Sequence, residues 1–168
     1  MGRRYGPAAP DLALPPLDID PLRPAQITAI EGIERSLAEQ RFDRSLVQMA
    51  TSAGKTYTAV TGCYRLLKHG GFTRILFLVD RNNLADQTLA EFQNYRTPGD
   101  GRRFTELYNV DKLTSAGMLA SSSVVISTIQ RVYRVLSGEA VPEGDGPGLD
   151  DYVPDAPVTV AYNGAHQR

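Results

Sequence analysis

The residue types that could do chemistry gather in one short segment. Residues 49–60 read MATSAGKTYTAV, in which Gly54, Lys55 and Thr56 follow four small residues at 50–53. Small residues let backbone N–H groups close around phosphate oxygens, a lysine at this position reaches the β and γ phosphates, and a threonine hydroxyl binds Mg²⁺. The segment therefore predicts a phosphate-binding loop, with Thr56 as the metal ligand.

The elements on either side of this segment decide whether the Gly-Lys-Thr triplet is a chance occurrence. The apolar run RSLVQMA, residues 44–50, predicts a strand that ends at the loop. An amphipathic helix is predicted from Lys55 to the glycine pair at 70–71, and its N-terminus would add partial positive charge at the phosphates. Ser52 stands where related loops often carry glycine, and a positive φ there would cost about 1 kcal/mol.

Strands and helices alternate along the rest of the chain, which predicts a mostly parallel α/β sheet with right-handed crossovers. The predicted elements are a helix over 26–40, a strand over 74–80 covered on both faces, a helix capped by Asn82 or Asn83, a strand over 104–110, a strand over 123–128 and a helix after it. Ligands of such sheets gather at the carboxyl ends of the strands, so the loops that follow strands are expected to share one edge.

The predicted helices each carry an apolar stripe that identifies core residues. These stripes are Ile30, Ile33 and Leu37; Val60, Cys63, Tyr64 and Leu67; Ala85, Leu89 and Phe92; and Ile129, Val132, Tyr133 and Leu136. Cys63 is therefore interpreted as a core residue rather than a reactive thiol, since nothing near it in the sequence would lower its pKa.

Composition excludes several classes of protein. The chain has 168 residues, a net charge of −1, one cysteine and two histidines, so neither an internal disulfide nor a Cys/His zinc site is expected. The first 20 residues lack the apolar stretch of a secretory signal, and no run of about 18 apolar residues occurs, so a cytoplasmic protein with no membrane segment is expected. Any nucleic-acid binding must come from a local patch.

The segments that flank the loop resemble helicase motifs, in helicase order. LRPAQITAI resembles the adenine-binding segment, ATSAGKT the helicase form of the phosphate loop, RILFLVDRNNLADQ motif Ia and VVISTIQRVY motif Ib. Over residues 22–162 the chain resembles the first motor domain of a type I restriction enzyme R subunit, an ATP-driven DNA translocase of the superfamily 2 helicase type. The resemblance implies an incomplete RecA-like three-layer fold, ATP and Mg²⁺ as cofactors, duplex DNA as the track, and modification and specificity subunits as partners.

The resemblance also implies roles for particular residues. Gln26 would contact adenine, and Ala53, Gly54, Lys55 and Thr56 would hold the phosphates and the metal, with Lys55 as the catalytic residue. Arg81, Thr128 and Gln130 would lie near the DNA backbone. Structural alternatives stay open: Gln26 and Arg81 as surface residues, and Thr128 as a helix N-cap, a position at which it could also meet a phosphate.

The expected organisation is a proline-rich arm (1–21), a partial ATP-binding domain (22–136), an acidic Gly/Pro loop (137–157) and a short strand with a tail (158–168). The family's Asp-Glu-x-His motif, second motor domain with its arginine finger, and nuclease domain have no counterpart in the sequence. We therefore expect a truncated motor fragment that binds nucleotide and DNA without turnover. Two alternatives are a non-catalytic module that docks on an intact enzyme and a gene product without function.

Overall fold

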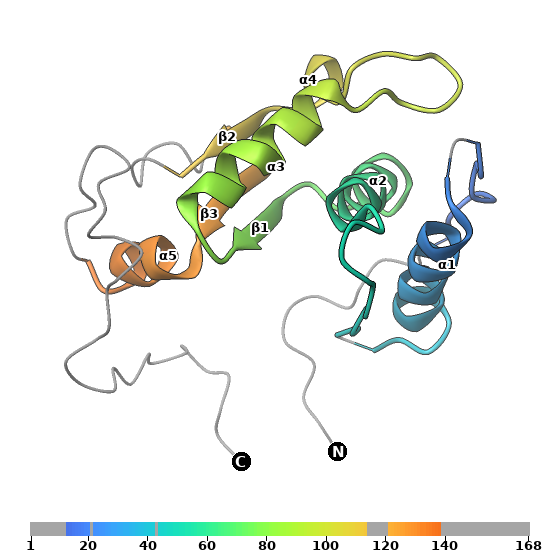
Figure 1. Cartoon of the computed structure of the whole chain (residues 1–168), viewed down its shortest axis with the longest axis horizontal. Helices are drawn as coiled ribbons and strands as arrows, with labels where there is room; N and C mark the ends of the chain where they lie inside the picture. Colours follow the sequence, from blue (N-terminus) through green and yellow to red (C-terminus); the bar gives the residue numbers. More distant parts are fainter. Residues whose placement is uncertain (1–12, 21, 43, 114–120, 139–168) are drawn as a thin grey trace.

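A small parallel sheet with α3, α4 and α5 around it, and the pair α1 and α2 to one side, make up the described part of the molecule (Figure 1). The computed structural model describes residues 13–20, 22–42, 44–113 and 121–138. Its elements are α1 (Pro24–Ala38), α2 (Lys55–His69), β1 (Ile75–Val79), α3 (Asn82–Asn94), α4 (Phe104–Leu107), β2 (Val110–Lys112), β3 (Val124–Thr128) and α5 (Ile129–Leu136).

The three described strands form one sheet in the order β1-β3-β2, and both pairings are parallel. In the β1–β3 pair Ile75 lies opposite Val124 and Val79 lies opposite Thr128. Parallel strands need crossover connections, and α3 and α4 form the one that leads from β1 to β2, with β3 lying between these two strands in the sheet. The predicted α/β fold with a mostly parallel sheet is confirmed, and it is consistent with part of a RecA-like domain.

An aromatic core fills the space between the sheet and the helices α2, α3 and α4. Phe92 and Phe104 are fully buried, with ring centroids 4.9 Å apart in an edge-to-face arrangement. Tyr64 of α2 and Tyr95 pack against the same Phe104 ring. Edge-to-face pairs add about 0.5–1.5 kcal/mol each beyond the burial of their area, so this cluster fixes α2 against α3 and α4.

The limits and the buried face predicted for the helix α2 are confirmed. Gly70 is the C-cap of α2 and donates its N–H to the carbonyls of Arg65 and Leu66. The predicted stripe of α2 is buried, including Cys63 at 9% exposure. Burial raises the pKa of the Cys63 thiol to about 12, so the interpretation of this residue as part of the core is confirmed.

Two strand predictions are wrong. Residues 44–50 form no strand, and Leu46 is 96% exposed, because an apolar run becomes a strand only where a neighbour pairs with its backbone. The segment FTELYNV divides instead: Phe104–Leu107 form α4, and the strand begins only at Val110.

The strand β1 is covered on one face only. Ile75, Phe77 and Val79 pack toward the core, whereas Leu76 and Leu78 are 50% and 47% exposed. The expected covering of both faces is therefore wrong for the part of the chain that the structure describes. β1 also lies at one edge of this sheet, so its outer edge has no strand partner among the described residues.

Helix caps and the last helix show further differences from the prediction. Arg81, not Asn82 or Asn83, is the N-cap of α3. Thr128 is the N-cap of α5, which confirms the structural role that the sequence suggested for it beside a DNA contact. In α5 the predicted apolar stripe is only partly covered, since Ile129 and Leu136 are 60% and 69% exposed.

Several predicted regions lie outside the described residues. They are most of the arm at 1–21, the acidic loop from residue 139 onward and the strand and tail over 158–168; the arm's residues 13–20 have no helix or strand, as expected. Within the described segments, no helix combines the length and the apolar character needed to cross a membrane.

Candidate nucleotide-binding site

The loop of residues 50–54 turns sharply into α2 and depends on left-handed backbone positions. Gly54 is the N-cap of α2 with φ +83°, a conformation that glycine adopts without a steric cost. Ser52 has φ +62°, so the serine adopts the left-handed backbone conformation whose cost was considered from the sequence. An L-residue there stores about 1–2 kcal/mol, which the surrounding contacts must offset.

Lys55 is exposed and folds back over its own loop. Its Nζ donates a hydrogen bond to the Ala50 carbonyl at 3.2 Å, across the turn that the Ala53 N–H closes onto the same carbonyl at 3.3 Å. The ammonium group thus lies directly over the loop where phosphates would bind. A phosphate oxygen is a stronger partner for an ammonium group than a neutral carbonyl, so this contact is one that an anion can replace.

Gln26 is buried at 5% exposure and lies against the same loop. Its Oε1 accepts the Arg23 N–H at 2.9 Å and its Nε2 donates to the Gly54 carbonyl at 3.3 Å. A surface position for Gln26 is therefore excluded. The N-terminus of α1 and the start of α2 are joined through one side chain.

The contact between Gln26 and Gly54 leaves no room for a larger residue in the loop. A Cβ placed on Gly54 would lie 2.4 Å from Gln26 Nε2. The Gly54 carbonyl also accepts bonds from the Thr58 N–H at 3.0 Å and the Thr58 hydroxyl at 2.9 Å, so its direction is fixed. Glycine suits this position because of its φ, and a side chain here would force the end of the Gln26 side chain to move.

The three residues assigned to DNA come from the carboxyl ends of neighbouring strands. Val79 lies opposite Thr128 in the sheet, so the segments that follow β1 and β3 share one edge, as predicted for these two motif loops. The phosphate loop was expected at the same edge, but no described strand leads into it. Arg81 is strongly exposed there and lies 3.8 Å from the Asp80 carboxylate. Thr128 is 2% exposed, and its hydroxyl accepts the Arg131 N–H at 3.3 Å.

Gln130 completes this edge, and its Oε1 is buried without a hydrogen-bond partner in the described part of the chain. Such a group costs free energy unless something pairs with it, and its position follows the N-cap of α5. An amide oxygen only accepts hydrogen bonds, so the unpaired Oε1 is not itself a phosphate contact. The Thr128 hydroxyl accepts the cap bond, and the groups at this edge that can donate to a phosphate are the backbone N–H groups at the start of α5, the Gln130 amide NH2 and the Arg81 guanidinium.

Sequence reasoning missed two contacts that hold this region together. Arg23 Nη1 lies 3.5 Å from the Ser52 carbonyl, 29 residues away, a separation at which the sequence carries no signal; only the Arg23–Gln26 contact had one, in the spacing of these residues at a Pro-initiated helix. Arg65 of α2 pairs with Glu34 of α1, with Nε to Oε1 at 2.5 Å and Nη2 to Oε2 at 3.1 Å. Both contacts fix α1 against α2.

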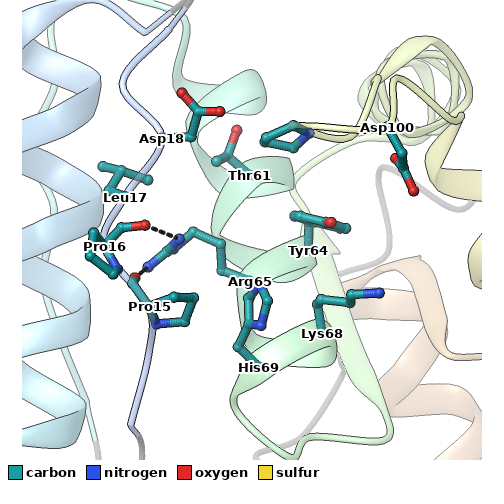
Figure 2. A pocket seen from close by; sticks show the side chains of 11 residues that line it. Pro15, Pro16, Leu17, Asp18, Thr61, Tyr64, Arg65, Lys68, His69 and Asp100 are labelled. Atoms are coloured by element: carbon teal, nitrogen blue, oxygen red, sulfur yellow. Dashed lines mark hydrogen bonds between the residues drawn. The ribbon is translucent and has the colours of Figure 1, made fainter.

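Arg65 also holds the arm that precedes α1, beside a cavity of about 310 Å³. Its Nη2 and Nη1 donate to the carbonyls of Pro15 and Pro16 at 2.5 and 3.4 Å (Figure 2). None of the predicted nucleotide residues lines this cavity, so it is separate from the phosphate loop. Among the described residues no group of three His, Cys, Asp or Glu side chains could hold a metal ion. The metal-binding role of Thr56 stays a prediction.

The parallel sheet and the order of its motif segments define a helicase-like α/β domain of which the described strands form a part. A family model described as "Type III restriction enzyme, res subunit" matches residues 19–148, and the chain belongs to this family.

Curated relatives narrow the similarity to type I systems. The chain is 34% identical over 113 residues to the type I restriction enzyme EcoKI endonuclease subunit of Escherichia coli K12, which covers 67% of this chain and 9% of that protein. It is 43% identical over 72 residues to the type I restriction enzyme EcoAI endonuclease subunit of Escherichia coli, a match that covers 40% of this chain and 9% of that protein. It is 25% identical over 145 residues to the type I restriction enzyme SsaAORF53P endonuclease subunit of Staphylococcus saprophyticus, a match that covers 83% of this chain and 14% of that protein.

The predicted resemblance to the R subunit is thereby confirmed. The chain spans only about a tenth of the length of these curated relatives. It is a fragment related to the helicase-like region of the type I restriction enzyme R subunit.

Proposed function

We propose that this chain binds ATP and Mg²⁺ at the loop of residues 50–56 and contacts the phosphate backbone of duplex DNA at the segments after β1 and β3. The observation that carries the nucleotide site is the junction of Gln26 with Gly54, because it places a side-chain amide beside a loop whose lysine already lies over it. Such a junction brings a base-reading group and a phosphate-binding group together.

Different residues of the chain would bind the different parts of the nucleotide. Lys55 would leave the Ala50 carbonyl and neutralise the β and γ phosphates, while the N–H groups at the start of α2 point toward them. Gln26 would exchange its present partners for the adenine edge. Mg²⁺ held by Thr56 would supply charge neutralisation between the phosphates.

The DNA contacts proposed for Arg81, Gln130 and the helix N-terminus that Thr128 caps rest on their shared edge. These groups face the sugar-phosphate backbone in the proposal, so binding would be independent of base sequence. We further propose that residues 22–136 form the ATP-binding unit of a longer DNA translocase that works with modification and specificity subunits. In that assembly the remaining parts of the motor would supply the acid pair and the arginine finger.

A second candidate is a module that docks on an intact enzyme without turnover. The observation that favours it is the uncovered face of β1, where Leu76 and Leu78 are about half exposed beside the open edge of the described sheet. Exposed apolar strands at a sheet edge invite pairing with another chain. A pull-down with intact modification and specificity subunits tests this candidate, since capture by them that is lost in Leu76→Lys is the result it requires.

The nucleotide proposal is tested by titrating a fluorescent ATP analogue against the parent chain and Lys55→Ala. We expect saturable binding that requires Mg²⁺ for full affinity and is strongly weakened in the variant. Equal affinities in the two proteins would reject the loop as the site.

A further inference from the structure

A rigid, arginine-rich loop joins α3 to α4. Residues 96–103 read RTPGDGRR, and Arg96 and Arg103 lie opposite each other in an isolated antiparallel bridge. Arg102 is next to this pair, and all three arginines are exposed. The loop therefore concentrates positive charge on a chain whose net charge is −1.

Hydrogen bonds inside the loop hold its shape. The Thr97 N–H donates to the Arg102 carbonyl at 2.8 Å, and the Thr97 hydroxyl donates to the Asp100 carboxylate while lying 3.0 Å from the Arg102 carbonyl oxygen. Arg102 Nε donates to the same carboxylate at 2.9 Å, and Arg96 Nη1 donates to the Gly101 carbonyl at 3.1 Å. The bond from Thr97 and the bonds from Arg102 lower the pKa of Asp100 to about 2, so the loop is organised at neutral pH.

The positive charges of Arg96 and Arg103 repel each other, and a bound anion would reduce this repulsion. Two cations directly opposite each other on paired backbone segments repel, and the Arg103 side chain makes no hydrogen bond or ion pair to the described part of the chain. Arginine guanidinium groups match phosphate oxygens in shape and are weakly hydrated, so a polyanion laid across the loop would relieve this repulsion. A preorganised loop would also lose little entropy on binding.

The tip of the loop is open to such a partner. Gly99 and Gly101 have φ +86° and +66°, and a Cβ at either position would meet no atom within 4 Å. The end of α2 lies beside the loop: Lys68, Asp100 and Asp18 all line the cavity shown in Figure 2. Lys68 adds a cation to this surface, whereas Asp100 already binds Arg102 and Asp18 is the one further carboxylate in the cavity.

This loop is far from the edge proposed above for DNA. Arg81 caps the N-terminus of α3 and Arg96 follows its C-terminus, with the 13 residues of the helix between them. A helix of this length spans about 20 Å at about 1.5 Å per residue. The same distance covers about six base pairs of duplex, at about 3.4 Å each along one strand. One duplex could therefore reach both ends of α3.

We propose that the loop of residues 96–103, with Lys68, is a second binding surface for the phosphate backbone of duplex nucleic acid. The choice of ligand rests on the proposed DNA binding, whereas the surface itself rests on the charge and rigidity of the loop. Its contacts are to phosphates alone, so it adds affinity and orientation without base specificity.

The test is the salt dependence of binding, measured by fluorescence anisotropy with a short labelled duplex and the full chain. The variants are Arg103→Gln and Lys68→Gln, and the control is Arg35→Gln, an exposed arginine of α1. Each lost phosphate contact should reduce the slope of log affinity against log salt by about 0.9. We expect this reduction in Arg103→Gln, a smaller one in Lys68→Gln, and an unchanged slope in the control.

The outcomes separate this inference from the proposed function. Equal slopes for the parent, Arg103→Gln and Lys68→Gln, together with a reduced slope in Arg81→Gln, would overturn this surface and leave the edge at α3's N-terminus intact. Absence of duplex binding by the parent would overturn both. Displacement of the duplex by polyglutamate at equal charge, with loss of polyglutamate binding in Arg103→Gln, would assign the loop to acidic peptides and overturn the nucleic-acid assignment.

Discussion

Gln26 joins the start of α1 to the phosphate loop, with its amide Nε2 3.3 Å from the Gly54 carbonyl oxygen. The other end of the same amide accepts the Arg23 N–H at 2.9 Å. Both groups of the proposed adenine reader are thus engaged by the protein itself. A nucleotide must exchange these bonds, so reading of the base and the geometry of the phosphate loop are coupled through one side chain.

The first prediction tests this coupling with Gly54→Ala. The new Cβ would lie 2.4 Å from Gln26 Nε2 and the residue would keep φ +83°, so we expect a loss of unfolding free energy and of nucleotide affinity. The backbone conformation alone should cost about 1–2 kcal/mol. Urea unfolding of Gly54→Ala, Gln26→Ala and the double variant measures the interaction, with Gln40→Ala as a surface control.

The double variant decides the matter because removal of Gln26 removes the clash. We expect the cost of Gly54→Ala to be smaller when Gln26 is already alanine, by more than the error of additive behaviour, about 0.5 kcal/mol. If the losses of unfolding free energy in the two single variants add up to the loss in the double variant, the Gln26 side chain does not clash with a Cβ at position 54.

The second prediction concerns the ion pair between Arg65 and Glu34, whose side chains are 7% and 16% exposed. Glu34→Ala leaves a buried guanidinium that keeps only the carbonyls of Pro15 and Pro16. Breaking a buried pair in this way costs about 3–5 kcal/mol. At about 2–4 °C per kcal/mol for a chain of this size, the melting temperature should fall by about 6–20 °C.

The matched control for this prediction is Glu31→Ala, an exposed glutamate one turn earlier on α1. Calorimetry or circular dichroism gives both melting temperatures. A fall in Glu34→Ala no greater than in the control would mean that the pair does not hold α1 to α2.

The third prediction uses the Cys63 thiol, whose pKa burial raises from 9.0 to about 12. The folded chain should react with a thiol reagent at neutral pH only as fast as it unfolds, and denaturant should release full reactivity. Since the folded pKa is the higher one, the thiol stabilises the fold below about pH 9 and this contribution declines as pH rises toward about 12. Rapid labelling of the native chain would contradict the buried position.

The success of sequence reasoning here follows from local signals. The glycine at 70 and the apolar stripe of residues 60–67 fixed the limits and the buried face of α2, because both depend on neighbours within a few residues. The parallel sheet was predicted from the alternation of strands and helices along the chain. Thr128 was foreseen as an N-cap because its type and position make the cap by themselves.

The failures have non-local causes. Residues 44–50 have the apolar pattern of a strand, but pairing needs a neighbouring strand, and none of the described strands lies beside them. Leu76 and Leu78 are exposed for a related reason, since covering them requires another layer. The bonds of Gln26 to Arg23 and Gly54 depend on how α1 meets α2, which periodicity along either helix does not reveal.

The fourth prediction is that the 168-residue chain alone shows no ATP hydrolysis stimulated by DNA. Phosphoryl transfer depends on groups that position the metal, the water and the developing charge, and Lys55 with the loop supplies only part of them. Loss of an arginine finger alone lowers turnover by about 10³–10⁵. Phosphate release is measured with and without linear duplex, and Lys55→Ala controls for contaminating enzymes. Turnover that DNA stimulates and that Lys55→Ala abolishes would contradict this account.

The most direct test of the nucleotide site compares the affinities of ATP, ADP, AMP and adenosine by competition against one fluorescent nucleotide. The parent chain should prefer ATP and ADP over AMP and adenosine, because Lys55 lies over the loop where the β and γ phosphates would bind. In Lys55→Ala this preference should disappear while adenosine affinity stays unchanged, and Lys68→Ala, a lysine near the other end of α2, should behave as the parent. A preference for ATP and ADP that survives in Lys55→Ala would contradict the central claim.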